Sequence, residues 1–284
     1  TFDGTGNNLE NPLFGATHTP MQQRTTNAFT DGFNTPAGDE RPNPRLLSNR
    51  IFGQTELISD PLQLSDFCWV WGQFLDHDIT LTPDSREPAF IRVPTGDRHF
   101  DPQHTGEKMI FMSRSQTMEG TGTEAGNPRR FPNEITAFID GSNVYGSDEE
   151  RADYLRSFAG GKMRVSAGNL LPFNTVDGEL ASEIDTLAPH MDDAVGFFAK
   201  HFVAGDVRAN ENPLLTSFHT LFVREHNRLC DELAAANPDW NDEQLYQHAR
   251  KIVGGELQSI VYEQYLPAMG VHLGDYQGYK PAVD

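Results

Sequence analysis

The stretch of residues 68–78, Cys-Trp-Val-Trp-Gly-Gln-Phe-Leu-Asp-His-Asp, most strongly limits what this chain can fold into. In a helix, residues three and four apart lie on the same face, so Gln73, Asp76 and His77 should point the same way. Asp78 should point elsewhere, because each residue turns the helix by about 100°. An amide, a carboxylate and an imidazole among Trp, Phe, Leu and Val cost free energy unless they have partners. The stretch therefore predicts either a satisfied hydrogen-bond network or a catalytic pocket.

The composition restricts the partners that the chain can have. Its 284 residues include 41 Asp and Glu against 22 Lys and Arg, and the net charge is −19. Such a charge argues against nucleic acid and against an anionic membrane surface as partners. No apolar run reaches the roughly 18 residues of a membrane-spanning helix, so we expect no membrane span. Cys68 and Cys230 both lie in apolar helical patterns, which favours two buried free thiols over a disulfide.

The pattern of residues predicts a mainly α fold with long irregular loops and little β structure. Residues 1–56 are rich in Gly, Asn, Pro and Thr, which form turns, and they predict an extended arm. Residues 57–284 predict a helical core. The two parts are expected to form a single domain over residues 1–284.

The first part of the core has one clear helix signal. Asp60 followed by Pro61 predicts a helix start, and this helix should run to about Asp78. Residues that follow it are irregular. Only the short apolar pieces at residues 90–93 and 109–112 indicate brief strands.

The second part of the core has three helix signals. A short acidic helix is expected near residues 148–157. Asn212 followed by Pro213 predicts the start of a strongly amphipathic helix. A capping box at residues 241–244 predicts the start of another, which should end before Pro267.

A segment rich in oxygen atoms lies between these regions. Thr136, Phe138, Asp140 and Ser142 follow one another at steps of two, and Gly141 allows a tight bend. An extended backbone would turn their hydroxyl, carboxylate and carbonyl oxygens to one side, which suits a hard cation such as Ca²⁺. A turn with local side-chain hydrogen bonds explains the same pattern. Spacing alone leaves both interpretations open.

Two charged residues precede the amphipathic helix. Arg208 and Glu211 lie three apart, just before Pro213. They can form a simple ion pair, or they can belong to an active site. The residues themselves do not decide between these alternatives.

Four segments together carry a resemblance to the animal-type haem peroxidases of the peroxidase–cyclooxygenase superfamily. Residues 71–78 resemble the distal helix of that family, and residues 138–147 resemble its calcium loop. Residues 204–229 resemble its distal arginine segment, and residues 251–267 resemble the helix that follows. The segments occur in the family's order over essentially the whole chain. The resemblance implies the helical fold of that family, with haem b and Ca²⁺ as cofactors, and the low cysteine content suggests a bacterial member.

The resemblance also implies roles for individual residues. His77 would be the distal base, which takes a proton from H₂O₂ and returns it to the leaving oxygen. Arg208 would stabilise negative charge as the O–O bond breaks. Gln73 would orient water or a halide beside His77.

Cofactor-binding residues follow from the same resemblance. Asp76 and Glu211 match the carboxylates that form ester bonds with haem methyl groups. The matching Ca²⁺ ligands are Asp78, Thr136, Phe138 through its main-chain carbonyl, Asp140 and Ser142. Asp78 would anchor the distal helix from the side opposite His77.

One position departs from the family pattern. Asn212 stands where myeloperoxidase-like members have a methionine that forms a sulfonium link to haem, which asparagine cannot form. That link makes haem more oxidising, so chloride is a poor candidate donor here. Bromide, iodide, thiocyanate and phenols are the expected reductants.

The proximal iron ligand is not found in the sequence. The family's proximal histidine lies some tens of residues after the Tyr-Leu-Pro segment at residues 265–267. His248 and His272 come nearest in order, but the surrounding pattern is missing. We expect this chain to be a piece of a longer protein, with the ligand beyond Asp284.

The sequence thus predicts a secreted haem peroxidase that reduces H₂O₂ through a ferryl intermediate and oxidises a small anionic or phenolic donor. A haem-dependent fatty-acid dioxygenase of the same superfamily is one alternative. A non-catalytic adhesion or matrix module is another, although it would not need Gln73, His77 and Arg208 together. Oxygen uptake with a fatty acid in the absence of peroxide would identify the dioxygenase.

Overall fold

The computed structural model describes residues 1–38, 40–193 and 196–283, and the chain forms two compact units. The helical unit contains Thr1–Thr19, Leu62–Leu81 and Glu134–Asp284. The loop-rich unit contains Pro20–Pro61 and Thr82–Asn133. All of the predicted site residues belong to the helical unit.

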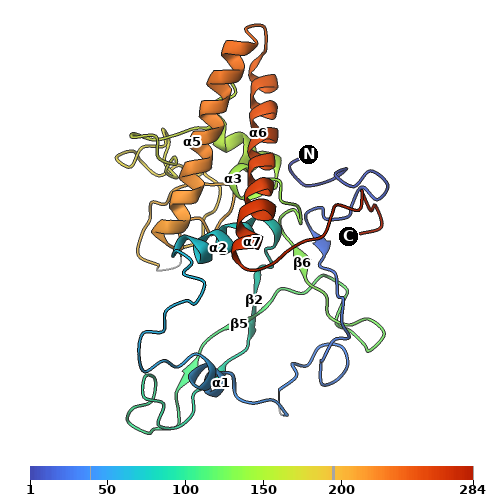
Figure 1. Cartoon of the computed structure of the whole chain (residues 1–284). Coiled ribbons are helices and arrows are strands. Elements are labelled where there is room, and N and C mark those ends of the chain that lie inside the picture. Colours follow the sequence, from blue (N-terminus) through green and yellow to red (C-terminus); the bar gives the residue numbers. More distant parts are fainter. Residues whose placement is uncertain (39, 194–195, 284) are drawn as a thin grey trace. The chain divides into compact units, whose positions relative to one another are not determined.

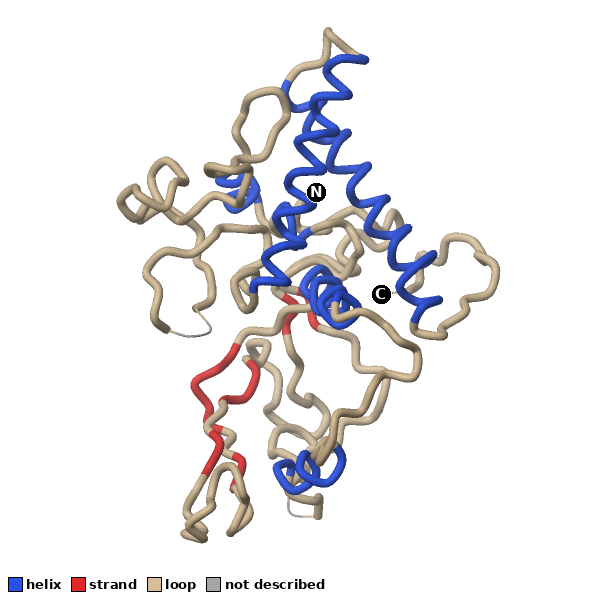
Figure 2. Tube along the Cα trace, turned by 60° about the vertical axis from the view of Figure 1, so that its left-hand side comes forward, coloured by secondary structure: helices blue, strands red, loops and turns tan. Residues whose placement is uncertain are grey.

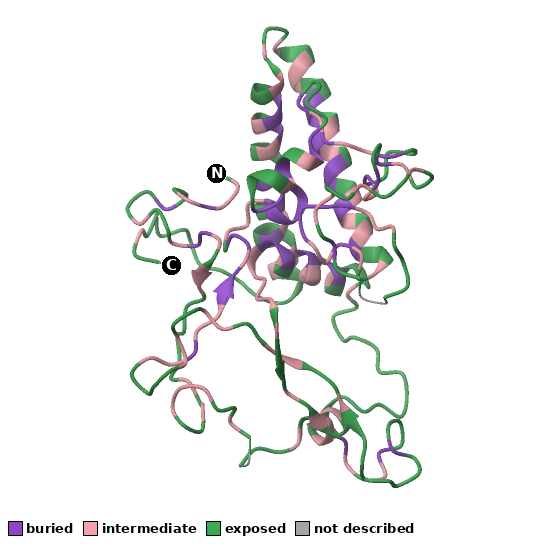
Figure 3. Cartoon of the chain, turned by 180° about the vertical axis from the view of Figure 1, so that it is seen from behind, coloured by how far each residue is buried: buried purple, intermediate pink, exposed green. Residues whose placement is uncertain are grey.

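Two long helices, α5 (Pro213–Ala236) and α6 (Asp242–Ser259), dominate the helical unit and lie side by side (Figure 1). The predicted start of α5 is confirmed, since the Asn212 side chain accepts a hydrogen bond from the Leu215 N–H at 2.9 Å. The capping box that begins α6 is also confirmed. Buried residues line both helices (Figure 3), as expected for amphipathic helices that share a core.

The α-helix α6 ends at Ser259, before Pro267 as predicted, but the chain stays helical beyond that proline. The helical path continues through a π-helical segment, η1 (Ile260–Tyr265), into α7 (Leu266–Ala268). The Leu266 N–H bonds to the Val261 carbonyl, five residues back. Pro267 then lies in the first turn of α7, where the missing N–H of proline costs little.

The helix that carries His77, α2, spans Phe67–Ile79, so the predicted start at Asp60 is wrong. Gln63 has a φ of 55°, a left-handed conformation that a right-handed helix cannot pass through. From Phe67 onward α2 packs on α5, and the Phe74 and Phe222 rings stack with centroids 5.4 Å apart. Gly72 allows close packing as well, because a Cβ there would lie 2.6 Å from the Tyr265 hydroxyl.

Two short helices complete the helical unit. The helix α3 (Ser142–Tyr145) is fully buried. The helix α4 (Glu149–Leu155) begins at Asp148, whose side chain accepts from the Arg151 N–H at 2.7 Å. The short acidic helix expected near residues 148–157 is therefore confirmed.

Among its described residues, the loop-rich unit contains a helix and short strands (Figure 2). The helix α1 (Pro44–Ile51), capped by Asn43, is unexpected because Pro42 and Pro44 indicate turns. The strand β3 pairs with β4, which confirms the strands expected at residues 90–93 and 109–112. The pairing of β2 with β5 was missed, since β2 is polar and mostly exposed. The strands are β1 (Thr19–Pro20), β2 (Asp84–Pro88), β3 (Ile91–Arg92), β4 (Met109–Ile110), β5 (Ser113–Ser115) and β6 (Pro132–Asn133).

The predicted fold class, mainly α with long irregular loops and little β structure, is confirmed. Both cysteines are free, although Cys68 is only half-buried. Across the part of the chain that the structure describes, the helices are too short or too polar to cross a membrane.

A buried histidine makes the stability of the helical unit depend on pH. His226 Nδ1 lies 2.9 Å from the Tyr145 hydroxyl and Nε2 lies 2.8 Å from the Gly161 carbonyl oxygen. Burial lowers the pKa of His226 to about 4. Since the unfolded chain has a pKa of about 6.5, it binds this proton first as the pH falls, which favours unfolding.

We therefore predict that the free energy of unfolding falls between about pH 6.5 and pH 4, with His226 contributing up to about 1.4 kcal/mol per pH unit. Urea unfolding at several pH values measures this slope. H226Q should reduce the slope, whereas H248Q, which changes an exposed histidine of α6, should keep it. Equal slopes in H226Q and the unchanged protein would contradict the assignment.

Candidate functional site

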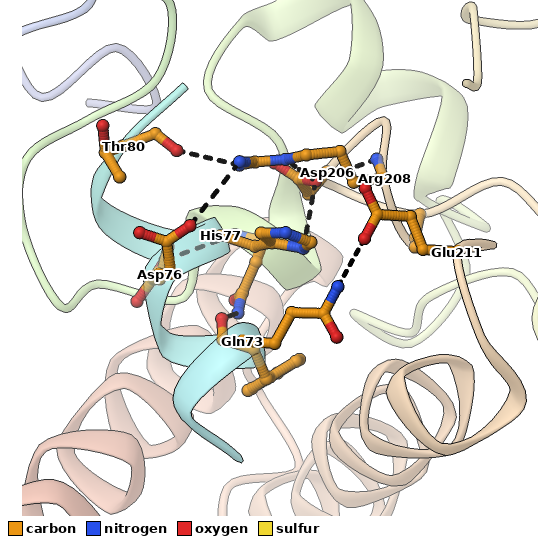
Figure 4. Close-up of polar contacts among 12 residues, drawn as sticks. Gln73, Asp76, His77, Thr80, Asp206, Arg208 and Glu211 are labelled. Carbon is orange, nitrogen blue, oxygen red and sulfur yellow. Dashed lines mark hydrogen bonds and ion pairs between the residues drawn. The ribbon is translucent and has the colours of Figure 1, made fainter. Parts of the chain in front are cut away.

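The face of α2 that the sequence singles out is turned toward the segment preceding α5. Gln73, Asp76 and His77 all point toward residues 206–211, as their spacing predicts (Figure 4). His77 is buried with 4% of its surface exposed, while Asp76 lies near the rim with its side chain 54% exposed. An imidazole at the bottom and a carboxylate at the edge are thus presented to the same space.

Arg208 is held in a fixed orientation above this face. Its Nε and one terminal nitrogen donate to the two carboxylate oxygens of Asp206, each at 2.8 Å. The same terminal nitrogen donates to the Thr80 carbonyl at 2.9 Å. The other terminal nitrogen lies 3.9 Å from Asp76 Oδ2. Two parallel bonds fix the plane of the guanidinium, and one donor edge remains directed at Asp76.

Asp206 joins the two predicted catalytic side chains, and sequence reasoning missed it. His77 Nδ1 lies 3.6 Å from Asp206 Oδ1, which is close but longer than a hydrogen bond. His77 and Arg208 therefore meet as predicted, through one carboxylate. The available signal was an acidic residue in the otherwise apolar run of residues 203–207, two positions before Arg208.

The protonation states at this site follow from burial and from the neighbouring charges. Burial lowers the pKa of His77 to about 4; Asp206 opposes this shift and Arg208 adds to it. Burial acts to raise the pKa of Asp206, but the bonds from Arg208 outweigh it, and the pKa lies below its usual value. At neutral pH the site therefore holds a neutral imidazole, an ionised carboxylate and a guanidinium.

Glu211 and Asn212 close another side of the site. The Gln73 side-chain amide donates to Glu211 Oε2, and Asn212 Nδ2 donates to Gln73 Oε1 at 3.0 Å. Partial burial raises the pKa of both Asp76 and Glu211. The structure thus brings together all five residues predicted to act on peroxide or haem.

An open cavity adjoins Glu211 and Asn212. Its volume is about 870 Å³, within the range of small-molecule and cofactor sites. Aromatic side chains from three segments form much of its wall, namely Phe67, Phe198, Phe202 and Phe218. A largely apolar ligand fits this aromatic wall, and Glu211 is the acidic side chain that lines it.

The five residues predicted to bind Ca²⁺ are Asp78 near the end of α2 and four residues of the loop at 136–142, and four of the five are connected by hydrogen bonds. The Ser142 hydroxyl donates to Asp78 Oδ1 at 2.8 Å, and the Gly141 N–H donates to Asp78 Oδ2 at 3.1 Å. Asp140 Oδ1 accepts from the Thr136 hydroxyl and from the Ser142 N–H, both at 3.1 Å. Phe138 lies in the same loop, and the role of its carbonyl stays a prediction.

The chemistry of this cluster fits a hard cation. Burial raises the pKa of Asp78, and the nearby Asp140 raises it further; burial also raises the pKa of Asp140. Asp140 Oδ2 is buried without a hydrogen-bond partner among the described residues. A divalent ion would neutralise both carboxylates and use that oxygen. The cluster has only two acidic side chains, and nowhere in the described chain do three or more His, Cys, Asp or Glu form a metal-binding group.

Comparison with known proteins gives consistent matches over the whole chain. The family model described as animal haem peroxidase matches residues 1–284. The human protein named peroxidasin homolog is 34% identical, over 100% of this chain and 21% of its own length. The chain therefore spans only about a fifth of that relative.

Solved structures agree with this result. Peroxidase A from Dictyostelium discoideum superposes with a TM-score of 0.85 at 32% identity, covering 99% of this chain and 55% of that one. The fatty acid alpha-dioxygenase of Arabidopsis thaliana has a TM-score of 0.71 at 20% identity, covering 94% of this chain and 37% of its own. The second likeness shows a shared fold alone.

We predict that removing Ca²⁺ with EGTA lowers the melting temperature, and that added Ca²⁺ restores it better than Mg²⁺, which prefers smaller octahedral sites. Calcium at about 100 times its Kd would stabilise the fold by about 2.7 kcal/mol. D140N should lose most of this response in a thermal unfolding assay. D148N, which changes the cap of α4 in the same unit, should retain it. A full calcium response in D140N would refute the ligand set.

Proposed function

We propose, since the chain belongs to the animal haem peroxidase family, that it reduces H₂O₂ to water and oxidises a small donor at the site of His77 and Arg208. The resemblance drawn from four sequence segments is confirmed by the family match. The observation that carries the proposal is a buried imidazole and a fixed guanidinium, both beside Asp206, which face the same space. We further propose that the two compact units form one haem peroxidase domain.

Haem is the cofactor that membership of this family implies. Asp76 and Glu211 would hold it by ester bonds to its methyl groups. Their raised pKa values favour the neutral carboxyl group, which carries no charge into an apolar site. When bound, haem would supply a redox-active iron and the oxidising power that is passed to the donor. The proximal ligand stays a prediction.

His77 would move the proton. Its neutral imidazole accepts a proton from one oxygen of H₂O₂ and returns it to the other, which leaves as water when the O–O bond breaks. The donor supplies the two electrons that complete the reduction of peroxide, and the protons that this reduction needs come from the donor or from solvent. A buried imidazole suits both steps, because it stays neutral and available at the pH of the reaction.

Arg208 and Gln73 would assist this transfer. As the O–O bond breaks, negative charge builds up on the leaving oxygen, and a guanidinium already fixed in place stabilises it without reorganising. The bonds of Arg208 to Asp206 and Thr80 provide this fixation. Gln73, held by Glu211 and Asn212, would orient water or a small anion beside His77.

The proposed donors are bromide, iodide, thiocyanate and phenols. Asn212 is an amide that bonds to Gln73, and it has no sulfur with which to form a link to haem. Chloride is harder to oxidise than bromide, iodide or thiocyanate, so it is the weakest candidate donor. We also propose Ca²⁺ behind α2, held by Asp78 and the loop at residues 136–142, and an extracellular location.

We predict that H77A binds haem normally but reacts with H₂O₂ at least about 100-fold more slowly, because it lacks the proton acceptor. Stopped-flow spectroscopy of the full-length haem protein measures this rate. H190A, which removes a histidine whose side chain is 79% exposed in the same unit, serves as the control.

Unchanged peroxide turnover in H77A would refute the role of His77. Oxygen uptake with a polyunsaturated fatty acid, without peroxide, would support the dioxygenase alternative. A protein that binds Ca²⁺ but shows no reaction of either kind would support the adhesion or matrix module.

A further inference from the structure

We infer that Asp206 is a positioning residue that fixes Arg208 and His77 relative to each other, an inference that rests on the proposed function. Asp206 has only 1% of its surface exposed, so it is part of the interior of the site. A buried carboxylate is costly unless its charge is compensated. Its compensation comes from Arg208, which ties the charge directly to the site.

The carboxylate determines where the guanidinium can lie. Asp206 occupies both Nε and one terminal nitrogen of Arg208, so the guanidinium plane cannot rotate without breaking two charge-assisted bonds. The bond from Arg208 to the Thr80 carbonyl, at the end of α2, fixes the direction in which the guanidinium group points. The remaining terminal nitrogen is therefore held on the side of Asp76, where peroxide would bind.

The same carboxylate faces the rear of the His77 ring. His77 Nδ1 is buried and has no hydrogen-bond partner among the described residues, and Asp206 Oδ1 lies 3.6 Å from it. A closing of about 0.6 Å would make an ordinary hydrogen bond. A hydrogen on Nδ1 that points at this oxygen leaves Nε2 without a hydrogen, and Nε2 is then the nitrogen that can accept a proton from peroxide.

The backbone of Asp206 is itself held against α3. Its N–H donates to the Asn143 carbonyl at 3.0 Å. A Cβ on the preceding residue, Gly205, would lie 2.5 Å from the Ser142 carbonyl oxygen and 2.6 Å from that of Asn143, so only glycine allows this approach. Asn143 also donates from Nδ2 to the Phe74 carbonyl of α2 at 2.7 Å. Asp206 and His77 are thus fixed to the same short helix, as a precise site requires.

The test uses the full-length haem protein and measures cyanide association as well as the reaction with H₂O₂. Hydrogen cyanide, like H₂O₂, must lose a proton near the iron, so its binding rate reports the base without turnover. D206N keeps the size of the side chain but removes its charge. We expect D206N to lower both rate constants by about 10- to 100-fold with normal haem content.

Two further variants separate positioning from a general effect on folding. D242N is the matched control, because Asp242 likewise bonds to an arginine, Arg156, and to a backbone N–H, at 2.8 and 2.6 Å. D242N should leave both rates unchanged. D206S makes room for formate. Added formate should restore the rate of cyanide association in D206S, and it should leave the rate of the unchanged protein as it is. Such rescue requires a carboxylate at this place.

A double-mutant cycle provides the last measurement. If Asp206 acts through His77, D206N should slow cyanide association far less in an H77A background. Three results would overturn the inference. The effects of D206N and H77A on the rate could multiply in full, or D206N could have the same rates as the unchanged protein. The third is loss of haem from both D206N and D206S while D242N retains it. If the unchanged protein binds haem but reacts with neither peroxide nor cyanide, the proposed function itself fails.

Discussion

The hydrogen bonds of Asn143 are the interaction on which the arrangement of the site depends. From within α3, the Asn143 side chain bonds to the Phe74 carbonyl, and its N–H bonds to Asp78 Oδ1 at 3.2 Å. Its carbonyl accepts the N–H of Asp206. These buried groups would each cost about 1–3 kcal/mol if left unpaired, so α2 and the Asp206 segment cannot separate from α3 cheaply. The proposed catalytic residues and the proposed Ca²⁺ ligands consequently share one rigid support.

This shared support explains how two sides of α2 can serve different purposes. One side of the helix presents His77 to Asp206 and Arg208, and the next residue, Asp78, is held by Ser142 and Gly141. The Trp71 and Phe74 rings of α2 pack on Phe222 of α5, and this packing prevents α2 from rotating. A cation at Asp78 and Asp140 would therefore stabilise the position of His77 without contacting it.

Sequence patterns predicted the features that neighbouring residues determine. The Asn212 and Asn241 side chains cap their helices by accepting the backbone N–H three residues on, and the shared face of Gln73 and His77 depends on helix geometry alone. The start of α2 could not be predicted in this way, because a left-handed Gln63 interrupts a plausible helix signal. Asp206 was missed for a related reason: its contact with His77, which lies more than 120 positions earlier in the chain, becomes visible only in the fold.

The balance of charge at the site bears on which donors can reach it. Arg208 is largely neutralised by Asp206, so it cannot by itself attract an anion into a protein with a net charge of −19. Asp76 and Glu211 flank the approach and would repel halide or thiocyanate when ionised. Ester bonds to haem would remove both negative charges at once, whereas phenols are neutral and would be much less affected. In the proposed enzyme, the extent of esterification would therefore act on donor preference as well as on haem retention.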